Sequence, residues 1–217
     1  MDEPRIYVLA GTNGAGKSSV GGAEFRACGT DYFNPDEAAL RILAENPGTS
    51  LSEANSAAWQ QGKRLLERAI ARRKDFAFET TLGGNTIPAL LESAASSGIA
   101  VHIWFVGLSS PELHIQRVRL RVAGGGHDIP EDKIRERYDR SRENLIQLLP
   151  KLTELRLLDN STQADLRSGA APQPRLILHW RRGRIVSVCD LRSAPEWTKP
   201  ILTAVLKLSK RQTQNCT

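Results

Sequence analysis

The chain has 217 residues, 40% of them hydrophobic and 25% charged, with a formal net charge of +6. This length excludes two full domains, and the apolar content is enough for the core of one α/β domain of ordinary size. Positive charge can indicate nucleic-acid binding, but Lys and Arg are spread along the chain and are followed closely by Asp or Glu, so nucleic acid is not the favoured partner.

The cysteines and the apolar runs narrow the class of protein further. Cys28, Cys189 and Cys216 are too few and too far apart for a disulfide framework or a metal knuckle. The N-terminal residues M-D-E-P-R-I lack the apolar stretch of a secretory signal. No apolar run approaches the roughly 20 residues that span a bilayer. We therefore expect a soluble cytoplasmic protein that does not contact membranes.

The first half of the chain predicts strands and helices in alternation. Residues 6–10 are short, apolar and β-prone, which is typical of a buried parallel strand, and glycines follow them directly. Helices are predicted from about residue 17, over 36–45, and over 52–73 with Ser52 as a candidate N-cap. The next strand-like segments are residues 32–33 and 75–80.

The alternation continues to Asn160. Helices are predicted over 87–97, from Pro111 to the glycines at 124–126, and over 130–149. Strands are predicted over 101–107 and 155–158. This order indicates an α/β fold of the P-loop type, with a mostly parallel sheet and helices on both faces.

After Asn160 the composition changes. Residues 163–174 contain Ser, Gly, Ala, Pro and Gln, as a linker or surface loop does. A hairpin is predicted over 175–188 around Arg181-Arg182-Gly183, and a helix over 197–210. We therefore divide the chain into an α/β domain at 1–162 and a linker with a small C-terminal appendage at 163–217.

Residues 11–18 read G-T-N-G-A-G-K-S and match the pattern G-x-x-x-x-G-K-[ST] between a predicted strand and a predicted helix. Backbone N–H groups must converge on phosphate oxygens there, and the helix N-terminus adds its positive end. Lys17 is expected to reach the β and γ phosphates, and the Ser18 hydroxyl to ligate Mg²⁺. ATP and Mg²⁺ are thus the predicted cofactors. The residues assigned to nucleotide binding in this segment are Gly11, Asn13, Gly14, Ala15, Gly16, Lys17, Ser18 and Ser19.

Two carboxylates are candidates for the other side of the site, because ligands bind at the carboxyl ends of parallel strands. Asp36, in F-N-P-D-E-A, is either the base that accepts a proton from an attacking hydroxyl or merely the cap of the next helix. Glu79 ends the strand F-A-F-E-T and is costly to bury without a partner. With Thr80 and Thr81 beside it, Glu79 is a candidate to hold Mg²⁺ through water or to bind substrate hydroxyls.

Arginines supply the cations that phosphoryl transfer requires. Arg117 and Arg121 are four residues apart and share a helix face. Our candidates are Arg117 and Arg121 as catalytic groups, with Arg137 and Arg140 as nucleotide-binding groups; the alternative is that these charge-rich helices present only a solvated face. The glycines at 124–126 are a candidate lid hinge, and His127 either touches phosphate or has no task.

Four segments occur in a characteristic order: G-T-N-G-A-G-K-S, F-N-P-D, F-E-T-T-L and R-V-R-L-R-V-A-G-G-G-H-D-I-P-E-D-K-I-R-E-R-Y-D-R-S-R-E-N-L. Together they resemble the zeta toxin family of P-loop kinases, and most closely its small stand-alone members that are often described as predicted ATPases. The resemblance extends over about residues 5–162 and is weak after Asn160.

The resemblance implies ATP-dependent phosphorylation of a hydroxyl on UDP-N-acetylglucosamine or another sugar nucleotide, a toxic activity, and an antitoxin as a candidate partner. By position, Lys17 and Ser18 serve ATP and Mg²⁺, Asp36 is the catalytic base, and Glu79 binds the substrate. Arg117 matches an arginine that neutralises phosphate charge, and Asn160 occupies the place of the loop beside adenine. The residues implied are Lys17, Ser18, Asp36, Glu79, Arg117 and Asn160.

The chain departs from the family pattern at one point. A second phosphate-binding arginine is expected just before the proline that opens the last long helix, and His127 and Asp128 stand there instead. Arg121, or an arginine of the following helix, is the candidate substitute.

Three functions remain open on the sequence. The leading hypothesis is a kinase acting on a small hydroxyl-bearing molecule. The second is an ATP-binding switch that hydrolyses ATP slowly without an acceptor. The third is a nucleic-acid kinase or ATPase, which requires binding that weakens steeply with salt.

Overall fold

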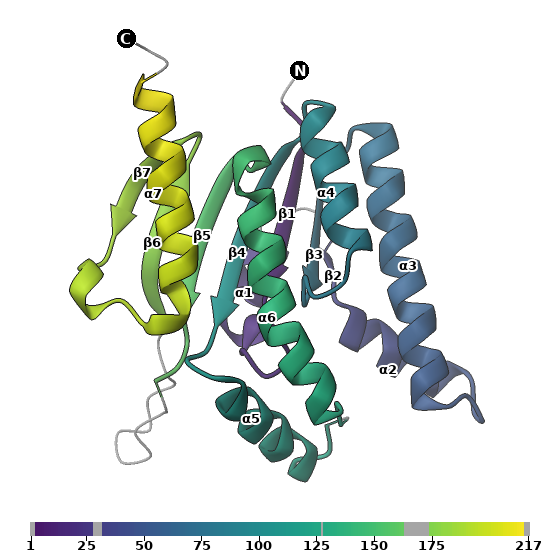
Figure 1. Ribbon diagram of the computed structural model, residues 1–217. Coiled ribbons are helices and arrows are strands. Elements are labelled where there is room, and N and C mark those ends of the chain that lie inside the picture. The colour runs from purple at the N-terminus through teal and green to yellow at the C-terminus, as the bar shows by residue number, and fades with distance from the viewer. Residues whose placement is uncertain (1–2, 28–31, 127, 163–173, 215–217) are drawn as a thin grey trace.

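The computed structural model describes residues 3–27, 32–126, 128–162 and 174–214 (Figure 1). The strands are β1 (Arg5–Ala10), β2 (Tyr32–Phe33), β3 (Phe76–Thr80), β4 (Ala100–Gly107), β5 (Glu154–Asp159), β6 (Arg175–Arg181) and β7 (Arg184–Val188). The α-helices are α1 (Lys17–Ala27), α2 (Pro35–Glu45), α3 (Leu51–Arg72), α4 (Thr86–Ser96), α5 (Pro111–Ala123), α6 (Glu131–Leu148) and α7 (Lys199–Gln214).

The strands form one seven-stranded sheet in the order β2-β3-β1-β4-β5-β6-β7. Pairings among β2, β3, β1, β4 and β5 are parallel, and β6 and β7 join antiparallel. The carboxyl ends of five parallel strands therefore meet at one edge, where α/β folds bind their ligands. The predicted α/β fold with a C-terminal hairpin and helix is confirmed.

Alternation along the strands divides the core into two layers. Ile6 and Val8 of β1 face the larger layer, which is covered by α3, α4, α6 and α7, whereas Leu9 faces the smaller one with Phe25 of α1. Figure 1 shows α1 behind the sheet, with α4, α6 and α7 in front. Helices thus lie on both faces, as predicted.

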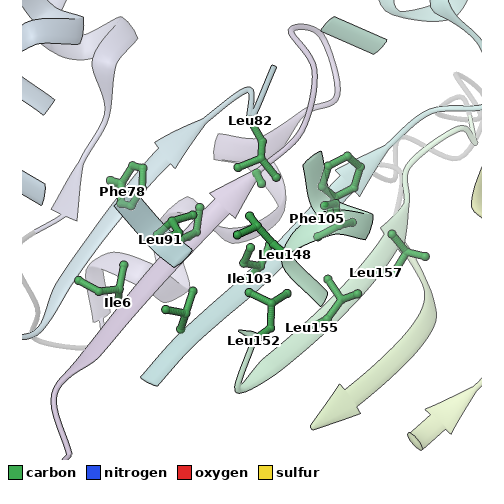
Figure 2. Packing of buried hydrophobic residues seen from close by; sticks show 14 of the residues in the cluster. Ile6, Phe78, Leu82, Leu91, Ile103, Phe105, Leu148, Leu152, Leu155 and Leu157 are labelled. Carbon is green, nitrogen blue, oxygen red and sulfur yellow. The ribbon is translucent and has the colours of Figure 1, made fainter. Parts of the chain in front are cut away.

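Leucines from the covering helices fill the larger layer. Leu148 of α6 lies beside Ile103 of β4, and Leu91 of α4 lies over β1 near Phe78 (Figure 2); Leu91 is 1% exposed. Burying one such side chain contributes about 1.5–3 kcal/mol, so this layer holds the strands in the register that places their carboxyl ends together.

The C-terminal segment is built into the same sheet and core. Strand β6 pairs along the whole of β5, and Trp180, Ile201 and Val205 belong to the larger core layer. The linker predicted at 163–174 lies almost entirely outside the described residues. The segment that the sequence predicts to be an appendage therefore extends the edge of the sheet. Its hairpin buries one face against α7.

Most predicted boundaries hold within two residues, with one correction. Ser52 is not the N-cap of α3; Ser50 caps it, accepting from the Glu53 N–H at 3.3 Å while the Glu53 carboxylate accepts from the Ser50 N–H at 2.9 Å. This reciprocal pair satisfies two helix-end donors, which places the start of the helix earlier than the apolar spacing did. The last α-helix begins at Lys199, after a 3₁₀ turn at Glu196–Thr198.

Within the described ranges, no helix has the length and apolar character needed to cross a membrane. Cys189 is a free thiol. Cys28 and Cys216 lie outside the described residues.

Candidate active site

The loop after β1 has the backbone of a phosphate cradle. Gly11, Gly14 and Gly16 have φ values of +143°, +81° and +84°, a region that other residues rarely adopt. A Cβ on Gly14 would lie 2.7 Å from the His114 carbonyl oxygen, and one on Gly16 would lie 2.6 Å from Asn160 Nδ2. The loop therefore requires glycine both for its conformation and for its close packing, and it leads directly into the N-terminus of α1, which favours an anion.

Lys17 begins α1 and folds back over this loop. Its Nζ donates to the Gly11 carbonyl at 2.9 Å, so the ammonium lies across the loop that is expected to hold the phosphates. Burial lowers the pKa of Lys17, and the carboxylates of Glu79 and Asp36 oppose that effect. An ammonium held out of water interacts more strongly with a phosphate than an exposed one does.

Glu79 lies at the end of β3 and faces Ser18, the residue that follows Lys17. Its Oε1 accepts from Ser18 Oγ at 2.9 Å, from Asn34 Nδ2 at 3.2 Å and from the Tyr32 hydroxyl. Ser18 and Glu79 thus bring together oxygen atoms of the kind that Mg²⁺ prefers, and the site fits the ion predicted from the sequence. Ser18 would hold it there, with Glu79 as the adjacent carboxylate.

The helix that carries Asp36 is capped by a different residue. Asn34 is the N-cap of α2, and its Oδ1 accepts from the backbone N–H groups of Asp36 at 2.9 Å and Glu37 at 3.3 Å. The alternative that Asp36 merely caps the helix is therefore wrong, because Asn34 is the N-cap and Asp36 lies inside the first turn. The Asp36 side chain, about half exposed, instead lines a cavity.

Two arginines approach Asp36 from opposite helices. Arg121 Nη1 of α5 lies 3.7 Å from Asp36 Oδ2. Arg137 of α6 donates from Nη1 to Asn13 Oδ1 of the phosphate loop at 2.8 Å, and burial lowers its pKa. Arg137 fits closely because Gly83 has no side chain: a Cβ there would lie 2.8 Å from Arg137 Cγ. Both cations therefore lie near Asp36, and Arg137 also contacts the phosphate loop.

The other two arginine candidates lie elsewhere. Arg117 donates from Nη2 to the backbone carbonyls of Asn160 at 2.7 Å and Thr162 at 3.3 Å, so it supports the segment after β5. Arg140 lies half exposed beside Asn85 and Glu143. Asn160 donates from Nδ2 to the Ala15 carbonyl at 2.8 Å, which joins the β5 end to the phosphate loop.

A cavity of about 380 Å³ opens beside this cluster. Asn13, Asp36, Glu79 and Arg137 are among the residues that line it. Its other walls come from β2, from β3 and the loop after it, from α3, and from the start of α4. They include Thr80, Thr81, Thr86, Asn55, Ser56, Trp59, Lys63, Phe33, Phe78 and Ile87. Trp59 is 42% exposed, an unusual position for so large a ring, and it faces this space.

Several of these residues were missed in the sequence. Asn34 was readable, because Asn before Pro-Asp-Glu is a strong cap signal. Trp59, Asn55 and Ser56 gave no signal beyond a helical stripe, since their role depends on where α3 packs. The hinge predicted at the three glycines follows α5 as expected, but His127 lies outside the described residues.

His114 is a further residue that sequence reasoning passed over. It is 1% exposed, and its Nδ1–H donates to the Asn13 carbonyl of the phosphate loop at 2.8 Å. Burial lowers its pKa to about 4 from the ordinary 6.5, and the nearby cations Lys17, Arg117 and Arg142 act in the same direction. A neutral imidazole thus supports the loop.

Acid should therefore destabilise the fold through His114. Between pH 6.5 and 4, His114 binds a proton in the unfolded chain but not in the folded chain. The free energy of unfolding therefore falls as pH decreases, by about 3 kcal/mol over this range. Urea titrations at pH 7 and pH 4.5 measure this loss. In His114→Gln, which keeps a donor for Asn13, the loss should shrink by about 2–3 kcal/mol. Equal losses in both proteins would contradict the assignment, and His179→Gln on β6, the strand next to the edge strand β7, is the control.

Comparison with known proteins agrees with this geometry. The sequence profile of the zeta toxin family matches residues 1–165. An uncharacterised protein of Haemophilus influenzae is 33% identical over 142 residues, which are 64% of this chain and 94% of that protein. A chain of the AvrRxo1-ORF1:AvrRxo1-ORF2 complex, also determined with ATP, has a TM-score of 0.66 at 14% identity over 94% of this chain.

This chain spans 64% of that AvrRxo1 chain's length. A chain of the PezAT toxin-antitoxin system of Streptococcus pneumoniae has a TM-score of 0.52 at 15% identity, covering 79% of this chain and 75% of its own. The structural likenesses show the fold alone, whereas the sequence match covers most of the chain. The protein belongs to the zeta toxin family.

Proposed function

We propose that the protein is a kinase that transfers the γ-phosphate of ATP to an alcohol group of a small molecule. The observation that carries the proposal is the common cavity: Asp36, Arg137 and the phosphate-loop residue Asn13 line it together with Asn55, Ser56 and Trp59 of α3, so it extends from the phosphate loop to a wall that can contact an acceptor. A switch that only hydrolyses ATP needs room for a water molecule rather than for a second substrate.

The chemistry follows from the placement of these groups. An acceptor hydroxyl beside Asp36 transfers its proton to the carboxylate as its oxygen bonds to the γ-phosphorus, and the bond from phosphorus to the bridging oxygen breaks to release ADP. Lys17, Arg121 and Arg137 stabilise the charge on the transferring group. Mg²⁺ beside Ser18 supplies charge neutralisation at the phosphate oxygens.

The walls of the cavity suit a ring that carries hydroxyl groups. Trp59 offers a flat apolar face, while Ser56, Thr81, Thr86 and Asn55 offer hydrogen-bonding groups without charge. We infer a sugar nucleotide as the acceptor class, with UDP-N-acetylglucosamine as the first compound to test. Glu79 and Thr80, which also line the cavity, are our candidates to bind acceptor hydroxyls near the transferred phosphate.

A protein partner is part of the proposal. The AvrRxo1-ORF1 chain was determined together with ORF2, and PezAT is a chromosomal toxin-antitoxin system. We infer that a separately encoded antitoxin holds this protein inactive in the cytoplasm. The gene next to this one is the place to look for it.

The decisive experiment incubates the protein with Mg-ATP and a metabolite extract and searches by mass spectrometry for a compound that gains one phosphate. We expect one acceptor class to gain it, in the presence of ATP and not of a non-hydrolysable analogue. If labelled γ-phosphate appears only as free phosphate, the kinase assignment is wrong and the slow ATPase is correct. A labelled nucleic acid would support the third hypothesis.

A further inference from the structure

A polar cluster of four side chains lies beside the phosphate loop, and only part of it is explained by the site described above. Ser18, Tyr32 and Asn34 all donate to the same oxygen, Oε1 of Glu79. Ser18 lies on α1, Tyr32 on β2 and Glu79 on β3, so side chains from three elements meet at this one oxygen atom. Glu79 is 7% exposed and Asn34 5% exposed. A carboxylate buried to this degree is held by its donors.

The cluster fixes the direction of the Ser18 hydroxyl proton. A serine hydroxyl has one proton to donate and two lone pairs to offer. Because that proton is directed to Glu79 at 2.9 Å and Asn34 Nδ2 donates to Oγ at 3.4 Å, one lone pair of Oγ is left to face a cation. The position of the Glu79 carboxylate therefore decides how well Ser18 can act as a metal ligand.

Tyr32 adds a donor from the edge strand. Strand β2 has two residues, and its ladder pairing of Tyr32 with Ala77 and Phe33 with Phe78 sets it beside the end of β3. The Tyr32 ring packs edge-on against Phe25, 6.2 Å between centroids, so the ring has an anchor independent of its hydroxyl. Removing the hydroxyl alone is thus possible without removing the ring.

We propose that Tyr32 is a positioning residue for Mg²⁺: its hydroxyl holds the Glu79 carboxylate where it accepts the Ser18 proton, so that Ser18 Oγ presents a lone pair to the ion that accompanies ATP. The proposal rests on the proposed use of Mg-ATP by this site. It gives the hydroxyl of Tyr32 an effect on metal binding that a purely structural role would not have.

The test measures nucleotide binding by calorimetry, with a non-hydrolysable ATP analogue, first in EDTA and then over a series of Mg²⁺ concentrations. In Tyr32→Phe we expect the Mg²⁺ concentration for half-maximal enhancement to rise about 10-fold, the scale seen when a residue supporting a metal ligand is lost. Affinity in EDTA should stay within about twofold. Binding of Mn²⁺ followed by electron paramagnetic resonance should weaken in parallel.

The matched control is Tyr7→Phe. Tyr7 lies on β1, and its ring contacts Phe25 and His102. Tyr7→Phe therefore removes the same hydroxyl oxygen as Tyr32→Phe does, at a position away from Glu79. It should leave both binding measurements unchanged. A second variant, Glu79→Ala, which removes the acceptor oxygen, tests whether Tyr32 acts through the carboxylate: Tyr32→Phe should have little further effect in that background.

Three results would overturn the inference: an unchanged Mg²⁺ requirement in Tyr32→Phe, an equal loss of affinity with and without Mg²⁺, or a full effect of Tyr32→Phe in the Glu79→Ala background. Failure of the proposed function looks different, because the unmodified protein itself would then show no Mg²⁺-dependent nucleotide binding.

Discussion

Asp36→Asn should reduce phosphoryl transfer by about 10²–10⁴-fold while leaving ATP affinity nearly unchanged, because an amide cannot accept the proton of the attacking hydroxyl. The geometry separates the effect on phosphoryl transfer from any effect on ATP affinity. Asp36 faces the cavity from the first turn of α2, whereas the phosphate loop follows β1. The cap of α2 belongs to Asn34, so the substitution leaves the helix start intact.

Single-turnover transfer to the identified acceptor and calorimetric ATP binding are the two measurements. Glu37→Gln, one residue further along the same helix turn, is the matched control and should retain near-parental transfer. If Asp36→Asn transfers phosphate at the parental rate, Asp36 is not the base, and the ATP site alone remains. Loss of ATP affinity in step with transfer would instead assign Asp36 to the nucleotide.

The second large effect is expected for Lys17→Met. Removing the buried ammonium takes away the charge that lies across the phosphate loop, and we expect transfer to fall by about 10²–10³-fold or more. Unlike Asp36→Asn, this variant should also bind ATP more weakly. Methionine retains the length of the side chain, so the packing beside Gly11 is disturbed little.

Binding and steady-state kinetics with Mg-ATP measure this prediction, and circular dichroism checks that the variant is folded. Lys133→Met, an exposed lysine of α6 paired with Glu136, is the control for loss of a positive charge. Parental kcat/KM for ATP in Lys17→Met would show that the loop does not hold the triphosphate in the proposed way.

The sequence by itself determined the frame of the protein. The apolar strand, the glycine loop and the following helix have local causes: hydrophobic runs, positive φ at three glycines, and a helix N-terminus facing the phosphate. The assignment of Lys17 and Ser18 to the phosphate site followed from the spacing of the glycine loop alone. Asp36 and Glu79 could also be named, because polar residues after buried strands gather at one edge of a parallel sheet.

The sequence was ambiguous where the answer depends on packing between distant segments. Arg117 and Arg121 share a helix face, yet Arg121 lies near Asp36 while Arg117 binds the backbone after β5. The angle at which α5 crosses the loop makes this distinction, and no periodicity within α5 encodes it. Arg137 reaches Asn13 only because Gly83, 54 positions earlier, leaves the space.

The acceptor wall was beyond sequence reasoning for the same reason. In the sequence Trp59 belongs to an amphipathic stripe, and only the packing of α3 beside β3 and α4 turns it toward the cavity. The hairpin at 175–188 was found from its turn, but its addition to β5 was not, because strand pairing partners are chosen by complementary surfaces far apart in the chain. Local chemistry determined the phosphate loop, and tertiary packing decided which side chains stand opposite it.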